Sequence, residues 1–100
     1  TRASLASANL EKAIMIDANL SDAFMKEVNL TSAILKGANL ERANLYFANL
    51  KKAMMVGANF RETYLREANL EGASLENIKN LDSAIKCKTI FPWGEDNSTC

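Results

Sequence analysis

The chain has 100 residues, 48% of them apolar, which is enough for one compact domain but not for a second. It carries 12 basic and 12 acidic residues and no histidine. The balanced charge gives no net field toward nucleic acid or an acidic membrane surface, and the missing imidazole removes the side chain best suited to proton transfer near neutral pH. We therefore expect no nucleic-acid partner, no membrane partner and no hydrolytic or metal-dependent chemistry.

The N-terminal residues lack the apolar run of a secretory signal, and no stretch approaches the roughly 20 apolar residues that cross a bilayer. The chain begins inside a repeated pattern, whereas a repeat array normally starts with a segment that covers its first edge. We therefore expect a processed or trimmed N-terminus. If the native chain has no further residues there, we expect the open coil at residues 1–10 to pair with its counterpart in a second copy, as a two-fold homodimer.

A five-residue period runs without a slip from Ala3 to Leu75. A large apolar residue, which we call the centre, occupies every fifth position, and a small residue lies two positions before it. The centres include Leu10, Leu30, Leu50, Phe60 and Leu70. A period of five fits neither a helix with 3.6 residues per turn nor a strand with alternating faces, so an amphipathic helix is disfavoured.

The recurring run Ala-Asn-Leu, as at residues 8–10, 18–20, 38–40, 48–50 and 68–70, resembles the pentapeptide-repeat family. The resemblance covers about three quarters of the chain. It implies an all-β fold, a right-handed quadrilateral β-helix in which four pentapeptides form one coil, with the centre and the small residue pointing inward. Residues 1–75 would then make just under four coils, and residues 76–100 a C-terminal cap and tail.

With twenty residues in each coil, positions twenty apart lie above one another, so the outward residues can be sorted into four faces. The second face carries a ladder of asparagines at positions 9, 29, 49 and 69, which we interpret as structural because stacked amides can bond along the rod. The fourth face alternates Asp22, Arg42 and Glu62 in one column and places Glu41 beside Arg61. These are predicted to be cross-strand ion pairs.

The third face differs because five large apolar side chains point outward on it. They are the candidate contact face: Ile14, Ile16, Ile34, Met54 and Val56. Exposed apolar patches mark contact surfaces, but β-branched residues are also what outward strand positions favour, and the sequence leaves both interpretations open. The first face adds four aromatic residues, Phe24, Tyr46, Phe47 and Tyr64.

After Leu75 the five-residue frame breaks, because Asn80 falls where a centre should be. Leu75, Ile78, Leu81 and Ile85 are spaced by three and four residues, which predicts a short amphipathic helix covering the open end of the shaft.

Cys87 and Cys100 are the two cysteines, and both lie in this final segment. We predict that they form a disulfide rather than remaining two free thiols in a cytosolic protein. The tail resembles the ends of cyanobacterial and chloroplast members of the family, several of which are exported. The resemblance therefore implies the thylakoid lumen or periplasm, and otherwise the cytoplasm.

No phosphate-binding loop, catalytic triad or metal-ligand spacing appears, so we expect no catalytic residue, no cofactor and no metal site. We predict a non-catalytic rigid scaffold that presents its third face to an unidentified protein. The alternative comes from the resemblance, because some pentapeptide-repeat proteins mimic DNA and inhibit gyrase. That role uses a long, strongly acidic rod, whereas basic residues such as Lys12, Arg42 and Lys52 interrupt the acidic columns here.

Overall fold

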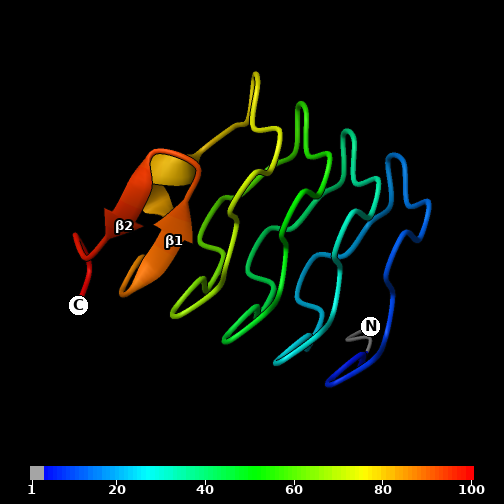
Figure 1. Cartoon of the computed structure of the whole chain (residues 1–100), viewed down its shortest axis with the longest axis horizontal. Coiled ribbons are helices and arrows are strands. Elements are labelled where there is room, and N and C mark those ends of the chain that lie inside the picture. The colour runs from blue at the N-terminus through cyan, green and yellow to red at the C-terminus, as the bar shows by residue number, and fades with distance from the viewer. Residues whose placement is uncertain (1–3) are drawn as a thin grey trace.

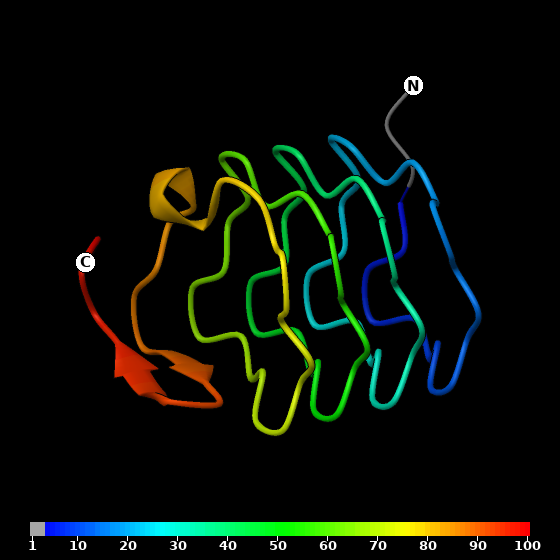
Figure 2. The same cartoon turned by 90° about the horizontal axis from the view of Figure 1, so that it is seen from above.

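The computed structural model describes residues 4–100, which wind into a short rod of stacked coils (Figures 1 and 2). Isolated parallel bridges join the residue before a centre to the residue twenty positions later, as in Asn9 to Asn29 to Asn49. These bridges fall into four columns, which start at Ser4, Asn9, Ile14 and Asn19. The Cα extents are 28 × 24 × 22 Å.

Each coil is held to the next by backbone hydrogen bonds that repeat with the same offsets. Leu30 N–H donates to Asn49 C=O at 2.8 Å, and Asn49 N–H donates to Val28 C=O at 2.9 Å. Between the bridges the chain turns through a residue with positive φ, for example Lys52 at 59° and Gly57 at 72°. Most of these corner residues are not glycine, so the repeated ladder must outweigh about 1 kcal/mol of backbone strain at each.

The centres and the small residues fill the shaft of the rod. Leu30, Leu50, Phe60 and Leu70 are 0% exposed, as the inward assignment requires. Leu10 is only partly buried, because it lies in the first described coil and packs against a neighbour on one side alone. Each fully buried centre contributes about 1.5–3 kcal/mol.

Thr63 takes a small-residue position and remains fully buried. Its hydroxyl donates to the carbonyl of Leu40 at 2.7 Å, which satisfies the polar group inside the shaft. Thr89 repeats this solution in the last part of the chain, where its hydroxyl donates to Leu65 C=O at 2.6 Å.

The amphipathic helix predicted from Leu75 to Ile85 is wrong. Only η1, the 3-10 helix Leu81–Ser83, is helical there. Lys79 still bridges Asn59, whereas the next two bridges, Tyr64 to Ile85 and Asn69 to Ile90, have a spacing of 21 residues. One extra residue has therefore entered the coil, and η1 accommodates it while the ladder resumes.

The ladder thus continues through the boundary predicted at residue 75. It ends at a hairpin made of β1 (Thr89–Phe91) and β2 (Gly94–Asp96), which pair in antiparallel orientation. Figure 2 shows the hairpin and η1 together at the C-terminal end of the rod. No helix within residues 4–100 is long and apolar enough to cross a membrane.

Candidate interaction surface

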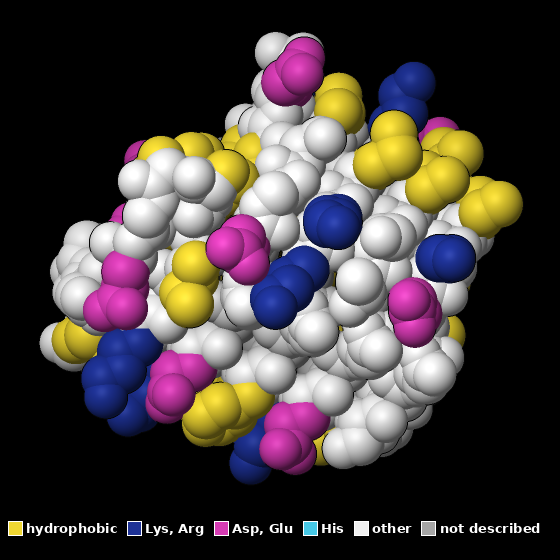
Figure 3. Space-filling view, in the orientation of Figure 1, with side chains coloured by type: hydrophobic (Ala, Val, Ile, Leu, Met, Phe, Trp, Pro, Cys, Tyr) yellow, Lys and Arg dark blue, Asp and Glu magenta, His cyan; other side chains and the backbone are white. Residues whose placement is uncertain are grey.

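The five residues of the candidate contact face form what we call the apolar wall: Ile14, Ile16, Ile34, Met54 and Val56. Ile14, Ile34 and Met54 are consecutive members of one bridge column, which ends at Ser74. Ile14 is 73% exposed, Ile16 52% and Met54 48%. Ile34 and Val56 are half-buried. In Figure 3 hydrophobic side chains gather at the upper right, over the N-terminal coils.

The outward direction of the wall follows from the alternation of each bridge. Ala33 and Leu35 flank Ile34 and are both 0% exposed, so the intervening side chain must leave the shaft. The corners beside the wall contain Gly37 and Gly57. A Cβ at Gly57 would have no neighbour within 4 Å, whereas one at Gly37 would meet the carboxylate of Asp17. Because both corner residues are glycines, neither places a side chain beside the apolar wall.

The aromatic residues of the first face contact one another and their neighbours. The rings of Tyr46 and Tyr64 meet edge to face with centroids 5.8 Å apart, and Lys26 Nζ lies 5.9 Å from the centroid of Phe47. Their outward atoms therefore contribute partly to stability within the rod. Compared with this aromatic face, the apolar wall leaves more of its side-chain surface without such contacts.

The fourth face carries the predicted ion pairs, centred on Arg42. Its guanidinium lies 2.9 Å from Asp22, 2.7 Å from Glu41 and 3.9 Å from Glu62, and Arg61 lies 3.9 Å from Glu41. The hydrogen bond and charge of Asp22 raise the pKa of Arg42 above its usual value. These side chains are solvated, so each pair contributes little, but together they neutralise the acidic column.

The asparagines have the structural role predicted for them. In each described repeat with an asparagine before its centre, the asparagine Oδ1 accepts a hydrogen bond from the N–H two residues later. Asn49 accepts from Lys51 N–H in this way at 3.1 Å. Amides also bond between coils, from Asn29 to Asn9 at 3.3 Å and from Asn59 to Asn39 at 3.2 Å. The asparagine ladder thus stabilises the corners.

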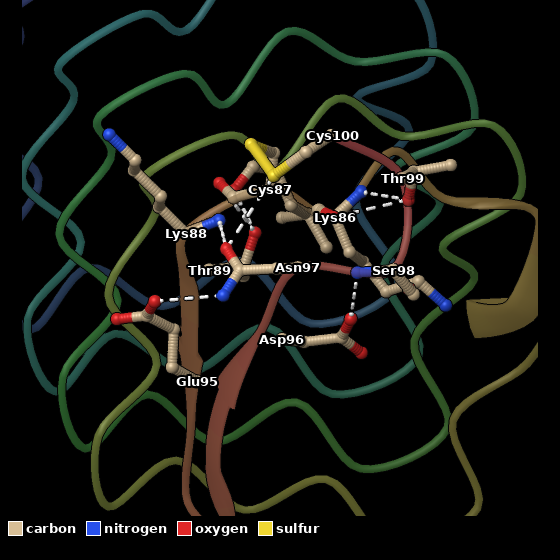
Figure 4. The surroundings of a disulfide bond; sticks show 11 residues. Lys86, Cys87, Lys88, Thr89, Glu95, Asp96, Asn97, Ser98, Thr99 and Cys100 are labelled. Carbon is tan, nitrogen blue, oxygen red and sulfur yellow. Dashed lines mark hydrogen bonds between the residues drawn. A yellow bond between two sulfur atoms is a disulfide. The ribbon is translucent and has the colours of Figure 1, made fainter.

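The predicted disulfide between Cys87 and Cys100 is confirmed, with Cα atoms 4.7 Å apart (Figure 4). Side-chain acceptors fix the returning tail beside it. Lys88 N–H donates to Asn97 Oδ1 at 2.7 Å, and Lys86 N–H donates to Thr99 Oγ1 at 2.7 Å. Hydrogen bonds from the side chain and the backbone N–H of Ser98 lower the pKa of Asp96 from its usual value.

Sequence reasoning missed two features of this end. Trp93 is 65% exposed and stacks on buried Phe91 with ring centroids 5.0 Å apart. Thr89 occupies a small-residue position, which the lost frame concealed. The sequence signal for this position was that Thr89 follows the small residue Ala68 by 21 residues, one more than the length of a coil. Across residues 4–100, no group of three or more acidic or cysteine side chains is placed to hold a metal ion.

A family model described as pentapeptide repeats matches residues 1–31, 25–61 and 43–79, in 8 copies. The chain therefore belongs to the pentapeptide-repeat family. The family and its solved structures define a right-handed β-helix, and its members are generally non-catalytic scaffolds. No curated protein matches the chain.

Three solved pentapeptide-repeat proteins are similar to it. One from Nostoc PCC 7120 is 31% identical with a TM-score of 0.75, over 77% of this chain and 64% of that one. One from the thylakoid lumen of Arabidopsis thaliana is 25% identical with a TM-score of 0.63, over 77% and 60%. One from Cyanothece 51142 is 41% identical with a TM-score of 0.55, over 81% and 52%. The matched region thus spans between half and two thirds of these proteins.

Proposed function

We propose that this chain is a rigid, non-catalytic scaffold of quadrilateral cross-section that binds another protein through the apolar wall. The observation that carries the proposal is the exposure of Ile14, Ile16 and Met54 on one face of the rod. Contiguous exposed apolar side chains cost free energy in water, and a protein contact recovers it. A ladder that fixes the backbone presents this surface with little loss of conformational entropy.

An oxidising compartment such as the thylakoid lumen or periplasm suits this proposal better than the cytoplasm. The Cys87–Cys100 disulfide and the relative from the thylakoid lumen support it. Mass measurement of protein alkylated directly from its native source would detect two modified thiols if the cytoplasmic alternative were right.

The DNA-mimic alternative requires acidic columns, and Arg42 interrupts the column of Asp22 and Glu62 through its contacts with Asp22, Glu41 and Glu62. We therefore expect no inhibition of gyrase supercoiling. Inhibition at low micromolar concentration would replace the scaffold proposal with the mimic.

The homodimer through the N-terminal coil also remains a proposal. Leu5, Leu10 and Met15 are partly buried, unlike the centres of the next coil, which supports an apolar contact there. Residues 1–3 lie outside the described residues. Sedimentation equilibrium should show a dimer that Leu5→Lys abolishes; a monomer at high micromolar concentration would contradict it.

The wall is tested by the double variant Ile34→Glu with Val56→Glu. Both side chains point outward, so the fold should persist by circular dichroism while binding of partner proteins from the native extract is lost. The matched control is Lys51→Glu, which changes the net charge by the same amount at an exposed position of another face. Unfolding of the wall variant would contradict the outward assignment, and equal partner capture by both variants would contradict the contact surface.

A further inference from the structure

The solenoid path stops two faces short of completing a further coil, because the bridge columns that begin at Ile14 and Asn19 end at Ser74 and Lys79. Ile90, the last bridged residue, lies above Asn69. A continuing coil would carry the next residues over Ser74, but the chain reverses through Pro92 and Trp93, and β2 returns along β1. In Figure 2 the yellow stretch around residues 73–78 has η1 near one end and the hairpin near the other.

The backbone groups that this missing segment would pair are open. In a lower coil, Leu35 N–H donates to Met54 C=O at 2.7 Å, Gly37 N–H donates to Val56 C=O at 2.9 Å, and Ala33 C=O accepts from Met54 N–H at 2.8 Å. The equivalent groups of the last coil are Leu75 N–H, Asn77 N–H and Ala73 C=O. None of them makes a hydrogen bond to protein among the described residues.

The side chains at this edge are also incompletely covered. Leu35 and Met55 are 0% exposed, whereas Leu75 in the same column of centres is only partly buried. Ile78 beside it is partly buried as well. The edge therefore combines unpaired peptide groups with apolar surface, the two features that an added strand satisfies.

The tail of the chain is held elsewhere. The disulfide to Cys87 and the bonds from Lys86 to Thr99 and from Lys88 to Asn97 keep the last residues over the opposite part of the coil. On the other side, Asn80 has a φ of 62° and η1 follows, which ends the regular edge. The part of the opening that lies on the third face is thus one pentapeptide long.

We propose that residues 73–77 bind an extended segment of a partner polypeptide, which adds in parallel as the next rung of the ladder. Its pattern is a small residue over Ala73, an outward residue over Ser74 and a large apolar residue over Leu75. A Lys or Arg follows, because it would lie over the exposed carboxylate of Glu76. The outward residue extends the column of the apolar wall.

This inference goes beyond the proposed function, because it assigns a separate surface and a defined ligand. The wall variants leave residues 73–77 unchanged, so either proposal can fail while the other holds.

The test uses a capped synthetic peptide with the sequence of residues 32–38, Ser-Ala-Ile-Leu-Lys-Gly-Ala, which has the required pattern. Nuclear magnetic resonance titration of the isotope-labelled whole chain should show saturable shifts of the Leu75 and Asn77 amides. A peptide methylated at the isoleucine nitrogen cannot donate to Ala73 C=O, so it should bind about three- to tenfold more weakly.

A charge exchange tests the register. Glu76→Lys should weaken the lysine peptide about two- to fivefold, and a peptide with glutamate in place of that lysine should recover the loss. Glu11→Lys, at an exposed position of the first coil, is the matched control and should change neither affinity.

Four results would overturn the inference. The first is the absence of saturable shifts at millimolar peptide. The second is a set of shifts confined to the apolar wall. The third is equal binding of the methylated peptide. The fourth is a shift of the Leu75 and Asn77 amides that depends on protein concentration alone, which would assign the edge to a second copy.

Discussion

The coils at residues 4–79 and the segment at residues 80–100 hold their conformations by different means. In the coils one hydrogen-bond pattern recurs every twenty residues, and equivalent side chains fill the same columns. The final segment is held instead by a 3-10 turn, a hairpin, a disulfide and side-chain hydrogen-bond acceptors, and none of these recurs along the chain. Damage within the coils should therefore spread along the array, whereas damage in the final segment should stay local.

The largest expected effect is that of a charge inside the shaft. Leu50→Lys should unfold the array, because Leu50 is 0% exposed and a buried unpaired ammonium costs several kcal/mol. Thermal unfolding followed by circular dichroism measures this. Leu50→Met keeps the volume and should cost less than about 1.5 kcal/mol. Unchanged unfolding of the lysine variant would refute the inward position of the centres.

Loss of the disulfide comes next. Cys100→Ser should destabilise the final segment by about 3 kcal/mol, the chain-entropy value for a loop of this length. Hydrogen exchange should accelerate for residues 86–91 and stay unchanged in the coils. Equal acceleration at Leu30 would show that the two regions unfold as one unit and would contradict the comparison.

Two glycine corners give a smaller, matched test within the coils. Gly57→Ala should cost about 1 kcal/mol, because its φ of 72° strains an alanine while the added Cβ meets nothing. Gly37→Ala should cost more, because its Cβ meets the Asp17 carboxylate. Adding Asp17→Ala should bring the two values together in denaturant unfolding. A lower cost at Gly37 than at Gly57 would be the contrary result.

The smallest effect is the pH dependence of the hairpin. The pKa of Asp96 is lowered in the folded state, chiefly by the side-chain hydrogen bond with Ser98, so its stabilisation is complete above about pH 3.8 and is lost as the pH falls through the folded pKa. The carboxyl shift of Asp96 in a magnetic-resonance titration should have its midpoint below the value for an unperturbed aspartate. A midpoint above that value would reverse the sign.

The five-residue period predicted the features that depend on stacking. Given the coil length, the column of Ile14, Ile34 and Met54 and the ion pairs of Arg42 follow directly, because identical offsets place them above one another. The final segment could not be predicted in the same way. Leu75, Ile78 and Leu81 have helical spacing. They nevertheless do not form one helix, because Leu75 and Leu81 line the shaft from two successive stretches of the solenoid. A single inserted residue changed the register, and only the packing of η1 reveals where it lies.

Methionine oxidation tests the central claim most directly, because the chain carries its own controls. Met25 and Met55 are 0% exposed, whereas Met54 is 48% exposed on the apolar wall. In dilute peroxide, mass spectrometry should find Met54 oxidised well before the other two, and native extract containing the partner should slow Met54 alone. Oxidation of Met55 as fast as Met54 would contradict the fold, and an unchanged Met54 rate in the extract would contradict the wall as a protein contact.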